Sequence, residues 1–179
     1  WFARPDPTAH DCSSTPAVTA DGSLFVAING DNGPRVWKLN ASTGALITQT
    51  PPLALPTSDS SSIAVSGNLV YVGVTKPYPG LGSLFVLDTN LIIRSAGIAA
   101  GEGVAAPPFV NGMFMYDGTL AGNLYKINSV TTNPDPSFGI GGRVEIGEPM
   151  ETSLYAVERL MGELELYAGT KAGRVYMVT

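Results

Sequence analysis

Residues 69–74 read Leu-Val-Tyr-Val-Gly-Val, and residues 84–88 read Leu-Phe-Val-Leu-Asp. Both stretches are short and rich in β-branched and aromatic residues, which favours strands over helices. The segment between them contains two prolines and two glycines, a composition typical of a turn. Together the two stretches predict an antiparallel hairpin.

The same strand-turn-strand plan occurs four times along the chain. Equivalent strands begin at Val36, Leu84, Leu124 and Val175, at intervals of 48, 40 and 51 residues. A repeat of this length is typical of propellers and solenoids. Because one small twisted sheet buries little surface alone, such units must stack face to face. We therefore expect an all-β fold, a β-propeller of four-stranded antiparallel blades with about four blades visible.

Each hairpin is flanked by further short strands. An inner strand is expected before each hairpin, and a fourth, outer strand after each of the first three. The fourth unit stops at Thr179 with no room for an outer strand, so Trp1 and Phe2 either complete it or belong to a blade that lies elsewhere. The chain is treated as one domain with approximate blades at residues 10–50, 58–97, 102–147 and 150–179, the last together with 1–5.

Residues 150–161 are ambiguous. Apolar side chains at Met150, Leu154, Val157 and Met161 follow helical spacing, and Pro149 suits the first turn of a helix. The register of the repeat instead requires a strand here, and we prefer the strand.

Composition and charge narrow the classes of partner. The chain has 21 Gly and 14 Pro in 179 residues, 44% hydrophobic and only 14% charged residues, which fits a folded domain of many turns. Its net charge is −5 and its 10 basic residues are scattered, so we expect no nucleic-acid partner. No stretch of about 20 apolar residues predicts membrane insertion. The single cysteine, Cys12, allows no internal disulfide.

Several stretches resemble the PQQ-like β-propeller repeat of quinoproteins. That repeat runs as a small inner strand, a Tyr-Val-Gly strand, a Leu-Tyr-Ala-Leu-Asp strand and a Thr-Gly turn. The counterparts here are 14–18, 36–44, 70–73, 84–88 and 121–128. The resemblance implies the fold rather than an activity. Family propellers usually have seven or eight blades, so it also implies that this chain is a fragment, one half of a shared ring, or an unusually small ring.

The resemblance also bears on catalysis. Quinone-dependent dehydrogenases of this fold use a vicinal cysteine pair beside the cofactor, and this chain has only Cys12. We therefore expect no enzyme activity and no resident cofactor in this chain.

A cation site is the best local candidate for chemistry. Acidic residues precede the inner strand of every unit, and stacking of the units would bring these loops towards one mouth of an axial channel. Carboxylates gathered there would suit a hard cation, so Ca²⁺ is the ion expected; solvated loop acids are the alternative. The residues concerned are Asp11, Asp59, Glu102, Glu148 and Glu151.

Three further features are candidate surface sites. Asn40-Ala41-Ser42 is a glycosylation sequon that matters if the chain is secreted by a eukaryote. Tyr78 stands between two prolines in a stiff loop that suits partner binding. Trp1 and Phe2 are the third candidate, as partners for an open strand edge.

These observations favour a non-catalytic propeller module, with an interaction or structural role in an extracellular or periplasmic assembly. Its partners would be proteins, further blades of the same protein or copies in an oligomer. Two alternatives stay open: a fragment of a quinone- or metal-dependent oxidoreductase whose active site lies outside this chain, and a carbohydrate- or ligand-binding propeller.

Overall fold

The chain folds entirely into antiparallel β-structure. The computed structural model describes residues 9–11, 14–53, 59–75, 82–159 and 163–179, without the side chains of 9–11 and 59–62. The described residues form strands, turns and bends, with no helix among them. The all-β prediction is therefore confirmed.

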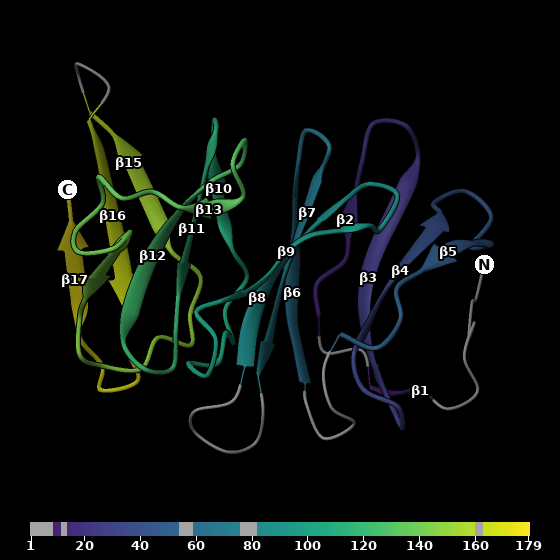
Figure 1. The fold of residues 1–179 in the computed structure, drawn as a ribbon, viewed down its shortest axis with the longest axis horizontal. Helices are drawn as coiled ribbons and strands as arrows, with labels where there is room; N and C mark the ends of the chain where they lie inside the picture. The colour runs from purple at the N-terminus through teal and green to yellow at the C-terminus, as the bar shows by residue number, and fades with distance from the viewer. Residues whose placement is uncertain (1–8, 12–13, 54–58, 76–81, 160–162) are drawn as a thin grey trace.

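The strands build four sheets that stand in a row in chain order, with the sheet of β3 at one end and the sheet of β16 at the other (Figure 1). The first sheet contains β1 (Ala9–Asp11), β2 (Ala17–Val18), β3 (Ser23–Gly30), β4 (Arg35–Asn40) and β5 (Leu46–Gln49). The second contains β6 (Asp59–Ser66), β7 (Leu69–Thr75), β8 (Gly82–Asp88) and β9 (Ile93–Ile98). The third contains β10 (Phe109–Asn111), β11 (Phe114–Gly118), β12 (Asn123–Asn128), β13 (Asn133–Pro134) and β14 (Arg143–Glu145). The fourth contains β15 (Tyr155–Glu158), β16 (Leu164–Gly169) and β17 (Val175–Val178).

Two sheets depart from the expected plan, because an edge of each is divided between two short strands. In the first sheet the inner edge is divided between β1 and β2, which both pair with β3, and the β1 pairing contains a register shift. In the third sheet the outer edge is divided between β13 and β14, which both pair with β12. An irregularity of this kind depends on tertiary pairing, and periodicity does not reveal it.

The ambiguous segment resolves as a strand. β15 pairs with β16, and Tyr155 lies opposite Tyr167 in the position that the repeat predicts. The helical spacing of apolar residues arises because Met150 and Leu154 pack from a connecting segment onto the third sheet, not from a helix. Met161 lies outside the described residues.

The core consists of three layers, one at each junction between neighbouring sheets. Alternation along a strand sends successive side chains to opposite faces. Thus on β7, Tyr71 faces the third sheet and Val72 faces the first, and both are fully buried. The layers centre on Phe25 and Phe85, on Met115 and Tyr125, and on Tyr116 and Leu166.

The two end sheets each have one face without a neighbouring sheet, and these two faces differ. On the first sheet, that face carries a separate cluster of Val26, Trp37 and Leu39, and Trp37 is only 1% exposed. On the fourth sheet, Tyr155, Val175 and Met177 are 69%, 73% and 57% exposed. The end face of the first sheet therefore buries Trp37 but leaves Val18, opposite Leu24, 64% exposed, whereas the end face of the fourth sheet exposes all three of these large apolar residues.

Candidate functional site

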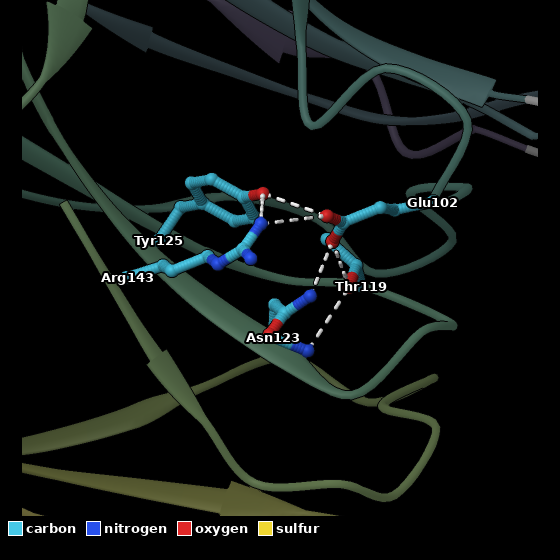
Figure 2. A network of polar contacts seen from close by, with 5 residues as sticks. All are labelled: Glu102, Thr119, Asn123, Tyr125 and Arg143. Carbon is cyan, nitrogen blue, oxygen red and sulfur yellow. Dashed lines mark hydrogen bonds and ion pairs between the residues drawn. The ribbon is translucent and has the colours of Figure 1, made fainter. Parts of the chain in front are cut away.

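The densest polar network joins the second sheet to the third and centres on Glu102 (Figure 2). Glu102 lies in the connection after β9. Its Oε2 accepts hydrogen bonds from the Thr119 hydroxyl and the Asn123 amide, both at 2.9 Å. Its Oε1 accepts the Tyr125 hydroxyl at 2.7 Å and lies 3.3 Å from the Arg143 guanidinium. Arg143, on β14, also donates to the Tyr125 hydroxyl at 3.1 Å.

The arrangement makes Glu102 a poor base or metal ligand. A carboxylate offers about four lone-pair directions, and four donors already occupy them here. The neighbouring Tyr125 is also held in its neutral, donating form, because burial raises the pKa of its hydroxyl. The network therefore acts as a clamp that fixes the connection after β9 against the turn between β11 and β12.

A second clamp of the same design joins the third sheet to the fourth. Glu148 accepts the Thr170 hydroxyl at 2.7 Å, and its other oxygen pairs with Arg174 at 2.7 Å. The backbone repeats as well. The amide of Leu120 donates to the carbonyl of Gly103 in the first clamp, and the amide of Lys171 donates to that of Pro149 in the second, each at 2.9 Å.

The two clamps share a sequence motif, which differs from any of the catalytic motifs. Residues 119–125 read Thr-Leu-Ala-Gly-Asn-Leu-Tyr, and residues 170–176 read Thr-Lys-Ala-Gly-Arg-Val-Tyr. Each copy places a Thr at the end of one strand and a Tyr on the next, with a Gly-Glu pair upstream at 101–102 and 147–148. Comparing the repeats for shared polar residues would have found them.

The structure does not gather the described acids into one site. Glu102 and Glu148 occupy equivalent places at successive junctions, and Glu151 pairs with Lys171 at 2.9 Å. Among the residues that the structure describes, no group of three or more His, Cys, Asp or Glu could hold a metal ion. The side chains of Asp11 and Asp59 lie outside the description, so Ca²⁺ binding that involves them stays a prediction.

Asp117 is an unexpected buried acid. It lies on β11 opposite Tyr125 and is 2% exposed, and neither carboxyl oxygen has a hydrogen-bond partner among the described residues. Burial raises its pKa well above the ordinary value for aspartate. The equivalent positions on β7 and β16 hold Val72 and Ala168, both buried. A carboxyl group therefore stands where the repeat otherwise places an apolar side chain.

Of the predicted surface sites, the structure describes Asn40 but not Tyr78, Trp1 or Phe2. The Asn40 side-chain oxygen accepts hydrogen bonds from the amides of Ser42 and Thr43, at 2.9 and 3.0 Å. It thus closes the turn after β4, and its glycosylation stays a prediction.

Comparisons with known proteins bear on the fold alone. No family model matches the chain, and no curated protein matches it by sequence. Among solved structures, a europium-containing methanol dehydrogenase matches with a TM-score of 0.70 and 13% identity, over 92% of this chain and 39% of that one. Sqt1 from Saccharomyces cerevisiae matches with a TM-score of 0.66 and 12% identity, over 92% and 44% of the two chains.

A third match is an artificial protein. The computationally designed protein Ika4 matches with a TM-score of 0.57 and 11% identity, over 95% of this chain and 94% of Ika4. No helix in the described residues is long and apolar enough to cross a membrane. At these identities the matches carry no activity over to this chain, which spans well under half the length of the methanol dehydrogenase and of Sqt1. What they show is an all-β arrangement of stacked antiparallel sheets, shared with part of each of those two longer chains.

Proposed function

We propose that the chain is an arc of a β-propeller, with each sheet as one blade, and that it serves as a non-catalytic interaction module. Two of the matched structures, the methanol dehydrogenase and Sqt1, are propeller proteins, which supports the blade interpretation. The observation that carries the proposal is the open face of the fourth sheet, formed by Tyr155, Val175 and Met177.

This face is the continuation of three buried ones. Phe25, Tyr71 and Tyr116 hold equivalent positions on the second strand of successive sheets and are 0%, 0% and 6% exposed, because the next sheet covers each of them. Tyr167 holds the equivalent position on β16. Among the described residues no sheet packs on this face, and large apolar side chains meet solvent there instead. Contiguous exposed apolar residues mark an interaction surface.

The occupant that fits the open face is another sheet of the same kind. The three internal junctions already show which surface packs there: a sheet face made of small and aliphatic residues such as Val72, Met115 and Leu166. That sheet would be a further blade of the same polypeptide or of a partner protein. This chain covers only 39% of the methanol dehydrogenase chain and 44% of Sqt1, which supports the proposal that further blades complete the propeller.

The clamps support a structural rather than a catalytic role. Glu102 accepts hydrogen bonds from four donors and Glu148 from two, and these donors hold neighbouring sheets together. The extracellular or periplasmic location expected from the sequence is part of the proposal. Fractionation of the source organism with antibody against this chain tests it.

The decisive experiment compares two methionines of nearly equal exposure. Met177 lies on the open face and is 57% exposed, and Met113 lies in the turn before β11 and is 59% exposed. Mild peroxide converts exposed methionine to its sulfoxide, which mass spectrometry locates. In the isolated chain both should be oxidised at similar rates. In the native assembly from the source, Met177 should be protected while Met113 still reacts.

Equal oxidation of the two methionines in the native assembly would overturn the proposal. The variant Val175→Asp provides an independent check, because a carboxylate on the open face would oppose burial. Although Val175 begins the edge strand β17, its side chain lies on the open face, so the variant should weaken association of the chain with its assembly at least tenfold, which corresponds to about 1.4 kcal/mol. Ile140→Asp is the matched control. Ile140 is 89% exposed and lies in the connection between β13 and β14, away from the open face, so this variant should associate as the unchanged chain does.

A further inference from the structure

A cavity of about 340 Å³ lies between the third and fourth sheets, at the end of β12 away from the Glu102 clamp. Its floor is formed by Tyr116 and Leu166, which are both buried, and Asn111 and Thr179 lie exposed at its rim. This volume falls within the range of small-molecule sites, which begins at roughly 300 Å³. Its other lining residues are Phe114, Lys126, Phe138, Leu164 and Val178.

The position equivalent to Lys126 makes different contacts at the other two junctions. Between the first and second sheets, Lys38 reaches across and donates to the carbonyl of Thr89 at 2.9 Å. Between the second and third sheets, the same strand position holds Val86, which is fully buried. Lys126 is the equivalent of Lys38 on β12, and it turns to Asp135 of its own sheet at 2.8 Å. The contact that Lys126 makes is thus a departure from the repeat.

An insertion in the third sheet builds one wall of this cavity. The chain between β12 and β14 runs from residue 129 to 142, whereas residues 41–45 and 89–92 suffice in the first two sheets. This longer connection supplies both Asp135 and Phe138. The Phe138 ring lies edge-on to Tyr116, with centroids 6.0 Å apart and an interplanar angle of 76°. The departure therefore adds aromatic surface to the cavity.

The charged group that lines the cavity is the Lys126 ammonium, which is held in a fixed place beside the polar groups of Tyr116 and Asn111. The Lys126 Nζ lies 4.0 Å from the centroid of the Phe114 ring and is paired with Asp135. The ion pair holds the pKa of Asp135 at about 2, because Lys126 and Ser137 donate to its carboxylate. An ammonium has three N–H donors, so after these two contacts it can offer one to a ligand. Because the pair has no net charge, a neutral acceptor suits it better than an anion.

We propose that this cavity binds a small planar aromatic ligand that carries one neutral hydrogen-bond acceptor. The ring packs between Phe114 and Phe138 over Tyr116, and the acceptor, a carbonyl or amide oxygen, takes a hydrogen bond from Lys126. Ring contacts of this type add to the burial of apolar area. The inference is independent of what covers the open face of the fourth sheet.

The test uses four probes that differ in one feature each: benzamide, cyclohexanecarboxamide, toluene and benzoate. Binding is measured on the 179-residue chain by NMR, from the side-chain signals of Phe114, Phe138 and Lys126. Benzamide should shift these signals with a Kd of about 1 mM or below. Removing the ring, removing the acceptor or adding a charge should each weaken binding at least about fivefold. Failure of benzamide to shift the three side chains, or equal binding of all four probes, would overturn the proposal.

Variants place the binding in this cavity. Leu164→Trp fills the space from β16 and should abolish benzamide binding, and Val178→Phe does so from β17 if the first variant does not fold. Phe138→Leu keeps apolar volume but removes the ring and should weaken binding about tenfold. Ile140→Ser changes an exposed residue of the same connection that does not line the cavity, so it should bind as the unchanged chain does. Benzamide binding that survives both filling variants would place the ligand elsewhere and contradict the proposal.

Discussion

The carboxyl group of Asp117 is buried between stacked sheets, at a position where the equivalent residues of other sheets are apolar. The sequence allows its position to be predicted, because the repeat aligns Asp117 with Val72 and Ala168, and strand alternation then turns all three towards the preceding sheet. What the sequence could not supply is the lack of a partner. That depends on which polar groups the facing sheet brings to the same spot.

Replacing Asp117 by valine should stabilise the protein. A buried polar group without a partner costs roughly 1–3 kcal/mol, so Asp117→Val should raise the free energy of unfolding at pH 7 by about that amount. The pH dependence has a definite sign. Because burial raises the pKa of the folded state, the unfolded chain loses its proton first, and stability falls as pH rises above about 4.

Urea unfolding at pH 4 to 8 checks both statements. The unchanged protein should lose stability over this range, and Asp117→Val should lose less of it. The reciprocal variant Val72→Asp, which puts a carboxyl at the equivalent place on β7, should be strongly destabilised. If Asp117→Val instead lowers stability, then the carboxyl has a stabilising partner, and the assignment of Asp117 as unpartnered is wrong.

Among the elements, the turns between the second and third strands carry the contacts between sheets. Gly122 and Gly173 hold the same place in two such turns, with φ of +85° and +78°. A Cβ on Gly122 would lie 2.5 Å from the Glu148 amide nitrogen, whereas one on Gly173 would meet nothing within 4 Å. The first turn is packed against the next connection, and the second is free of such a contact.

This pair separates backbone strain from steric contact. Gly173→Ala should cost about 1–2 kcal/mol in the free energy of unfolding, since alanine resists positive φ. Gly122→Ala should cost about 1–3 kcal/mol more, because the Glu148 backbone must also shift. Thermal and urea unfolding of both variants measure the difference. Equal losses would mean that the contact between Gly122 and the connection at Glu148 is absent in solution.

At the level of elements, the sequence predicts the strands well, but it predicts poorly how irregular edge strands pair and which residues connect neighbouring sheets. Alternating apolar residues and Gly turns identify β7 and β8 without any tertiary information. The division of the outer edge into β13 and β14 follows instead from an insertion whose contacts are made by Phe138 and Asp135. The Arg143 contact of the Glu102 clamp is hidden from the sequence for a related reason, since Arg143 reaches Glu102 from β14, 41 residues along the chain.

In the whole molecule, stability should vary along the row of sheets. The second sheet has buried side chains on both faces, from Tyr71 and Val72 outward, whereas the fourth has one face covered and β17 at its edge. Amides that are released only by global unfolding exchange most slowly. We expect the amides of β7 to exchange about 100-fold more slowly than the paired amides of β17, a difference of about 3 kcal/mol.

Hydrogen exchange of the isolated chain, read by NMR or mass spectrometry, provides the measurement. β8, which lies between β7 and β9, is the internal control and should behave as β7 does. Protection of β17 equal to that of β7 would contradict the picture of an open fourth sheet.

The unequal end faces also determine how copies of this chain can grow. If both end faces of the row were apolar and complementary, copies of the chain would associate head to tail. A heterologous contact of that kind that does not close produces fibres. Here the first sheet keeps Trp37 out of solvent but leaves Val18, on the same face, 64% exposed, so its end face offers less apolar surface than that of the fourth sheet. The two ends of one copy are therefore unlike surfaces, which works against head-to-tail growth.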